Sequence, residues 1–66
     1  MKLTVKHTVC VLTTLDCPEE LLNWNDPNVA KAYNEWLVKA LNKATKDYRY
    51  GEVFLHDVLE EYFQEN

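Results

Sequence analysis

Polar and apolar residues alternate along the first part of the chain, from Leu3 to Leu15. A period of two, together with many β-branched residues, is typical of a β-strand that buries one face. The alternation therefore predicts one long N-terminal strand. Its buried face is expected to carry Leu3, Val5, His7, Val9, Val11, Thr13 and Leu15.

No later segment pairs clearly with this strand in the sequence. A lone strand leaves a row of backbone N–H and C=O groups without partners, so it needs a neighbouring strand. The simplest neighbour is the same strand of a second subunit. We therefore expect a homodimer whose interface is formed by Leu3, Val5, Val9 and Val11.

Two helices are expected after the strand. Asp16 can cap a short helix that ends after Trp24, because the proline at position 27 interrupts it. A longer helix is predicted from about Pro27 to Lys46, with Asp26 as its N-cap. Its apolar stripe, at helical spacing, consists of Val29, Ala32, Tyr33, Trp36, Leu37, Ala40, Leu41 and Ala44.

The last segment has two interpretations. In the first, Glu52–Gln64 forms a third helix, because its apolar residues fall on one helical face. In the second, Tyr48–Leu55 is a strand that pairs with the N-terminal strand, and Asp57 caps a shorter helix. We favour the first. It predicts an α+β fold in a single domain spanning residues 1–66, with one long N-terminal strand followed by two or three helices.

Size and charge limit the possible functions. A chain of 66 residues buries only about 60% of its unfolded surface, so dimerisation would add needed burial. The net charge of −4 disfavours nonspecific binding to nucleic acid, which depends on Lys and Arg contacts to phosphate. The charge is also banded, with +2 in residues 1–15, −4 in residues 16–30, +3 in residues 31–50 and −5 in residues 51–66.

The sequence contains no catalytic or cofactor-binding pattern. It has no serine, no glycine-rich loop for phosphate, and no histidine placed to activate a cysteine. Adjacent acids such as Glu19 and Glu20 diverge by about 100° on a helix and do not form a catalytic pair. His7 and Cys10 point to opposite faces of a strand, so they do not share a metal ion. We therefore expect no enzymatic activity, no cofactor and no metal.

Three groups of side chains are candidates for binding a partner. Aromatic residues beside an arginine are typical of interface hot spots, although they also cover small cores. An acidic ridge suits a basic partner, and a lysine strip suits an anion, although each also fits a solvated helix face. The aromatic group is Trp24, Tyr48, Arg49 and Tyr50; the acidic group is Asp57, Glu60 and Glu61; the lysine strip is Lys39, Lys43 and Lys46.

The stretch Val11–Leu22, VLTTLDCPEELL, resembles the strand-to-helix entry of ribbon-helix-helix repressors. The resemblance covers about a fifth of the chain and implies strands that pair between two subunits. It also implies that outward polar residues of the strand read DNA. The sequence departs from the family in its helix break at Asp26-Pro27, its acidic charge and its few basic strand residues. The DNA-reading role would fall to Lys2, Thr4, Lys6 and Thr8.

We predict a small acidic, non-enzymatic homodimer that binds another protein as a regulator or inhibitor. A ribbon-helix-helix-like DNA-binding regulator is the alternative. Two cysteines are too few for a disulfide scaffold, and Lys6 and His7 interrupt the apolar stretch that a signal peptide would need. No apolar run approaches the roughly 20 residues of a membrane helix. We therefore expect a cytoplasmic protein without membrane contact.

Overall fold

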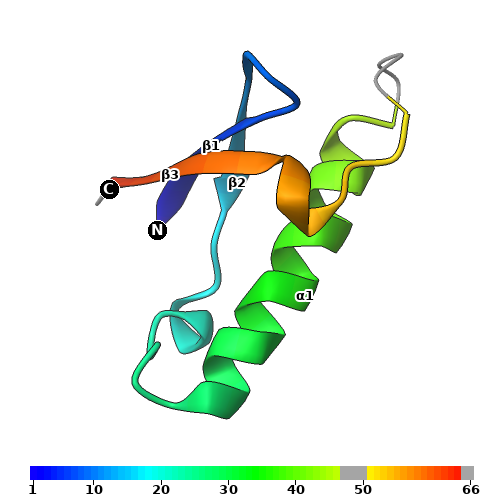
Figure 1. Cartoon of the computed structure of the whole chain (residues 1–66). Coiled ribbons are helices and arrows are strands. Elements are labelled where there is room, and N and C mark those ends of the chain that lie inside the picture. Colours follow the sequence, from blue (N-terminus) through cyan, green and yellow to red (C-terminus); the bar gives the residue numbers. More distant parts are fainter. Residues whose placement is uncertain (47–50, 65–66) are drawn as a thin grey trace.

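The computed structural model describes residues 1–46 and 51–64. Within these residues the chain forms a three-stranded antiparallel β-sheet, one long helix packed on one face of the sheet, and two 3-10 turns (Figure 1). The strands lie in the order β2-β1-β3. The elements are β1 (Lys2–His7), β2 (Val11–Asp16), η1 (Glu19–Leu21), α1 (Pro27–Ala44), η2 (Leu55–Asp57) and β3 (Val58–Gln64).

The N-terminal alternation forms two strands instead of one. β1 and β2 make an antiparallel hairpin in which His7 pairs with Val11 across the turn. The turn contains no glycine, asparagine or proline; instead, Thr8 and Val9 adopt φ angles of 48° and 70°. Such angles are unusual for β-branched residues, and the alternation runs unbroken through the turn. The turn therefore cannot be recognised from the sequence. The predicted fold class, one long strand followed by two or three helices, is therefore wrong.

The C-terminal segment is a strand and not the predicted third helix. Glu52–Gln64 forms an extended stretch, then η2, then β3, which pairs antiparallel with β1. The alternative of a strand at Tyr48–Leu55 is wrong over its described part, because residues 51–54 belong to no strand and the pairing strand begins at Val58; residues 48–50 lie outside the described part of the chain. The segment fits a helical period, but the open side of β1 offers it backbone hydrogen bonds and an apolar face. This tertiary context outweighs the local preference.

The central helix forms as predicted, although it ends at Ala44, two residues before the predicted end at Lys46. α1 follows Asp26, whose side chain accepts a hydrogen bond from the backbone N–H of Asn28 at 2.9 Å, as expected of an N-cap. The short helix predicted from Asp16 to Trp24 is reduced to the 3-10 turn η1, because Asp16 still belongs to β2. No helix within residues 1–46 and 51–64 is long and apolar enough to cross a membrane.

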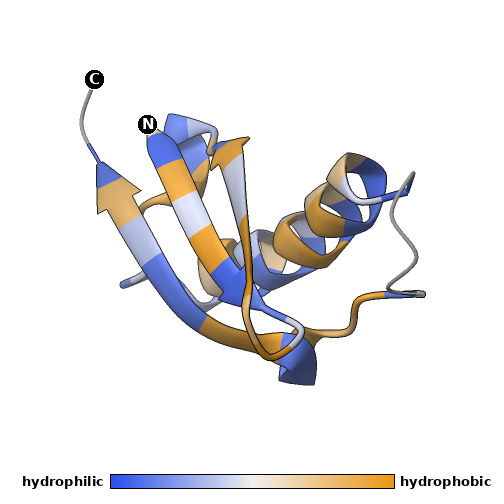
Figure 2. Ribbon diagram, turned by 90° about the horizontal axis from the view of Figure 1, so that it is seen from above, coloured by the Kyte–Doolittle hydropathy of each residue, from blue (hydrophilic) through white to orange (hydrophobic). Residues whose placement is uncertain are grey.

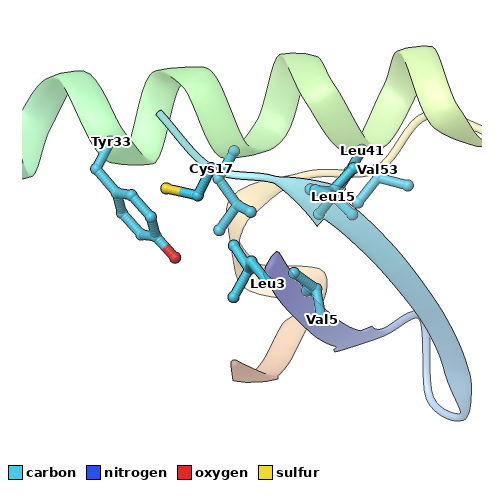
Figure 3. Close-up of a cluster of buried hydrophobic side chains, with 8 residues drawn as sticks. Leu3, Val5, Leu15, Cys17, Tyr33, Leu41 and Val53 are labelled. Atoms are coloured by element: carbon cyan, nitrogen blue, oxygen red, sulfur yellow. The ribbon is translucent and has the colours of Figure 1, made fainter. Parts of the chain in front are cut away.

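The core lies between the sheet and α1. In the view from above, β1 lies between β3 and β2, and α1 runs beside β2 (Figure 2). Side chains from both layers meet in the close-up of Figure 3. Burying one Leu or Val side chain contributes about 1.5–3 kcal/mol, which makes this small cluster the main source of stability. Its members are Leu3, Val5, Leu15, Cys17, Tyr33, Leu37, Leu41 and Val53.

Asn42 attaches the chain before β3 to the helix. Its side-chain oxygen accepts a hydrogen bond from the N–H of Val53 at 2.7 Å, and its amide donates to the Val53 carbonyl at 2.9 Å. Val53 is thereby held in the core with 1% of its surface exposed. Beyond it, the N–H of Thr8 donates to the carbonyl of Asp57 at 3.0 Å. The start of β3 therefore lies beside the hairpin turn.

Candidate functional site

Three segments meet beside the first two turns of α1 and line a small open pocket. Trp24 comes from the connection between η1 and α1, Tyr33 from the second turn of α1, and Glu61 from the middle of β3. Ala30 and Asn34 complete the lining of a volume of about 220 Å³. The fold thus brings together residues that lie far apart in the sequence.

Aromatic rings form an ordered surface at this pocket. The ring centroid of Trp24 lies 5.7 Å from that of Tyr33, at an interplanar angle of 65°, and 5.1 Å from that of Phe63. Tyr33 and Phe63 are themselves 6.2 Å apart. Tilted contacts of this kind add about 0.5–1.5 kcal/mol per pair to the burial of the rings. Trp24 is therefore held in place although it is 49% exposed.

Tyr33 contributes a buried hydroxyl without a hydrogen-bond partner in residues 1–46 and 51–64, although only 6% of the residue is exposed. Burial, and then the nearby negative charge of Glu61, raise the pKa of Tyr33, so the phenol stays protonated at neutral pH. The Glu61 carboxylate is thus close enough to raise the pKa of the Tyr33 hydroxyl both by its charge and by a hydrogen-bonding contact, although that contact falls outside the geometry of a full hydrogen bond. A buried polar group left unbonded costs about 1–3 kcal/mol, which a ligand atom bonding to it would recover.

The two adjacent glutamates of β3 lie on opposite faces of the sheet. Glu61 pairs with Val5, whose side chain lies in the core, and Glu61 therefore lies on the face that α1 covers. Glu60 pairs with Lys6 on the other face, where its carboxylate accepts a hydrogen bond from the hydroxyl of Tyr62. Only Glu61 belongs to the pocket.

Two residues predicted to bind a partner, Trp24 and Glu61, are thus brought together. Asp57 lies elsewhere, at η2, where its carboxylate accepts a hydrogen bond from the N–H of Phe54 at 2.8 Å. The sequence reasoning missed Tyr33, because it assigned this residue to the core stripe of the helix. No local pattern could have shown that its hydroxyl meets Glu61. The other predicted residues, Tyr48, Arg49 and Tyr50, lie outside the described part of the chain.

The residues predicted for the homodimer interface are divided between the core and the hairpin. Leu3 and Val5 are completely buried within one chain. Val11 is half-buried in β2, and Val9 is exposed at the turn. β1 has a paired strand on each side, so the unpaired strand that suggested a dimer is not present. The homodimer stays a prediction.

The residues considered for a metal site are separated. The ring of His7 is buried and hydrogen-bonded to the hydroxyls of Thr8 at 2.9 Å and Thr13 at 2.7 Å. Cys10 is exposed in the turn. In the part of the chain that the structure describes, no three His, Cys, Asp or Glu side chains are grouped so that they could hold a metal ion.

Comparisons of the chain with family models, with curated proteins and with solved structures each give no match. The helix entry that resembles ribbon-helix-helix repressors is also not formed, because the chain after β2 makes the turn η1. DNA binding stays a prediction that rests on the sequence alone.

Proposed function

We propose that the protein is a non-enzymatic protein-binding module, a regulator or inhibitor, whose pocket receives a cationic side chain of its partner. The observation that carries this proposal is that Trp24, Tyr33 and Glu61 line one small volume, and that the buried hydroxyl of Tyr33 has no full hydrogen-bond partner within residues 1–46 and 51–64. A lysine or arginine head group fits all three. An indole ring attracts a cation, a carboxylate pairs with it, and a phenol oxygen accepts its N–H.

The charge distribution supports a basic partner. The chain carries −4 in total, and residues 51–66 carry −5. Complementary charge of this kind speeds association more than it deepens affinity. Because Glu61 is exposed, its pairing with a cation is worth only about 0–1 kcal/mol. The aromatic surface of Trp24 is therefore expected to supply most of the binding energy at this site.

A reduced, cytoplasmic environment is part of the proposal. Cys10 and Cys17 are both free thiols, one exposed and the other buried. Burial raises the pKa of the Cys17 thiol and so lowers its reactivity. The fold of the described residues therefore does not depend on a disulfide.

The test removes the Trp24 ring and compares Glu61 with its neighbour Glu60, which lies on the opposite face of the sheet. A partner captured from the source cell is identified by mass spectrometry, and its binding to purified variants is measured by surface plasmon resonance. Trp24→Ala should weaken binding about 30-fold. Glu61→Gln should weaken it up to about fivefold, mainly through a slower on-rate with a flatter salt dependence. Glu60→Gln, on the opposite face, is the matched control and should change it less than twofold.

Two outcomes would contradict this function. The first is unchanged binding by Trp24→Ala and Glu61→Gln while far-ultraviolet circular dichroism shows an intact fold. The second is retention of duplex DNA at physiological salt with a requirement for Lys2 and Lys6, which would favour the DNA-binding alternative.

A further inference from the structure

The two edges of the sheet differ in how they discourage another strand. β3 carries Glu60 and Glu61 in its middle and has an irregular register where it meets Lys6 and His7. Charges and bulges at an edge both disfavour further pairing. β2, with the sequence VLTTLD, has a single charged residue, Asp16, at its very end. β2 is therefore the edge that is open to another strand.

The hydrogen-bond pattern shows which backbone groups of β2 point outward. Just beyond the strand ends, the N–H of Cys17 donates to the carbonyl of Met1 at 2.8 Å, and the Met1 amine donates back at 3.3 Å. Bonded and non-bonded pairs alternate in an antiparallel ladder. Every second residue of β2 therefore directs its N–H and C=O away from β1. These outward residues are Leu12, Thr14 and Asp16.

A groove of about 610 Å³ lies between this open edge and α1. In Figure 2, α1 lies on the side of β2 away from β1, so the helix continues the surface beyond the edge of the sheet. The apolar residues of α1 that line the groove, Trp36, Ala40 and Ala44, follow one another at four-residue spacing. The lining residues are Leu15, Asp16, Trp36, Lys39, Ala40, Lys43 and Ala44.

A strand added to β2 would lie over this groove. Alternate side chains of that strand would point toward α1, onto Trp36 and Ala40. The volume is large enough for a large apolar side chain, since pockets of about 300–1,000 Å³ hold whole small ligands. The same strand would bond to the outward backbone groups of β2 and cover an exposed flank of the helix. Strand addition with side chains in an adjacent groove is an established mode of peptide recognition.

The charges at the groove select the chemistry of the added strand. Lys39 and Lys43 are both exposed and lie one helical turn apart. Among residues 1–46 and 51–64 the one contact at salt-bridge distance joins His56 to Asp57, so neither lysine is paired there. Asp16, the carboxylate at the groove, lies opposite Lys2 in the ladder. The helix side of the groove therefore carries positive charge, although the protein as a whole is acidic.

We propose that the β2 edge and the adjoining groove bind an extended segment of a second protein, one that carries a large apolar side chain and neighbouring carboxylates. The apolar side chain enters the groove, and carboxylates on the same face of the segment meet Lys39 and Lys43. Residues two apart on a strand are separated by about 6.6 Å, close to the spacing of the two lysines. This surface shares no residue with the Trp24 pocket and does not depend on the function proposed for it.

The test uses two synthetic eight-residue peptides of alternating threonine and valine with a central phenylalanine. One carries two glutamates on the face of the phenylalanine, and the other carries two glutamines there. Each is titrated into the isotope-labelled full chain and followed by nuclear magnetic resonance. The acidic peptide should bind about tenfold tighter, with an advantage that shrinks as salt is raised. It should also protect the amide protons of Leu12, Thr14 and Asp16 from exchange.

Variants separate the strand from the charges. Thr14→Pro removes an outward backbone donor without breaking a backbone hydrogen bond to β1, and should abolish binding of both peptides; like its control, it also loses the side-chain hydrogen bond between Thr14 and Thr4 at 3.4 Å. Thr14→Val keeps the donor and is its control. The double variant Lys39→Glu, Lys43→Glu should reverse the peptide preference, whereas Lys31→Glu, on the same helix but outside the groove, should leave it unchanged.

Three results would overturn the inference. Equal affinity for the two peptides at β2 would refute the acidic partner. Absence of binding, or binding that Thr14→Pro retains, would refute strand addition. A peptide-free dimer in sedimentation that Thr14→Pro dissociates would assign the edge to a second copy of the chain. None of these results bears on the Trp24 pocket, so failure here is distinct from failure of the proposed function.

Discussion

Replacing Val9 with glycine should stabilise the protein. Val9 lies in the hairpin turn with a φ of 70°, a left-handed conformation that costs a non-glycine residue about 1–2 kcal/mol. Glycine adopts this conformation freely but loses about 0.5–1 kcal/mol more entropy on folding. The valine side chain is 80% exposed, so its removal sacrifices little buried surface. We expect a net gain of about 0.5–1 kcal/mol, which raises the melting temperature by about 2–8 °C.

The assay is urea and thermal unfolding followed by circular dichroism. Val9→Ala is the matched control, because it shortens the side chain but keeps the Cβ that disfavours positive φ. It should stay close to wild type, whereas Val9→Pro, whose ring fixes φ near −65°, should destabilise the hairpin strongly. If Val9→Gly is no more stable than Val9→Ala, the turn does not store the conformational strain that its φ angle indicates.

Three further predictions concern side chains in or beside the core. Leu37→Ala should lower the free energy of unfolding by about 2–5 kcal/mol in urea titrations, and by more than Trp36→Ala, because Leu37 is fully buried and Trp36 only partly. Burial lowers the pKa of His7, although the charge of Asp57 opposes this shift. The contribution of neutral His7 to the free energy of unfolding is therefore fully present above 6.5, the pKa of an unfolded histidine, and is lost as the pH falls below that value. Unfolding measured between pH 8 and 5.5 should show this loss, and His7→Gln should weaken it. Asn42→Ala leaves both polar groups of Val53 without their partner and should cost about 2 kcal/mol or more in the same titrations, whereas the exposed Asn34→Ala should cost less than about 0.5 kcal/mol.

The sequence by itself determined the central helix. A capping aspartate at position 26, a proline directly after it and an apolar stripe at helical spacing are local features, and each acts whether or not the rest of the chain is folded. The sequence also determined several of the N-terminal residues that face the core, since Leu3, Val5 and Leu15 are buried as the alternation predicted, whereas Val9, placed on the same face, is 80% exposed in the turn. This assignment of residues to the buried face holds because the side-chain period of a strand does not depend on which strand it pairs with.

Only the tertiary structure decided where the strands turn and which of them pair. The hairpin turn uses Thr8 and Val9, residues without intrinsic preference for positive φ, so the pairing of β1 with β2 must impose it. β3 forms from a segment with helical periodicity because β1 offers it a ladder of backbone bonds. Competition between a local pattern and a long-range partner is decided by burial and hydrogen bonds that the sequence does not list.

The same division applies to the candidate sites. The sequence singled out Trp24 and Glu61 by residue type, as an aromatic side chain beside a helix break and an acid on a polar ridge. That they meet at the hydroxyl of Tyr33 depends on the register between β1 and β3 and on the position of α1 over the sheet. The open edge of β2 likewise exists only because β3 occupies the other side of β1. Residue chemistry is a property of the sequence, whereas the proximity of distant residues is set by strand pairing and packing.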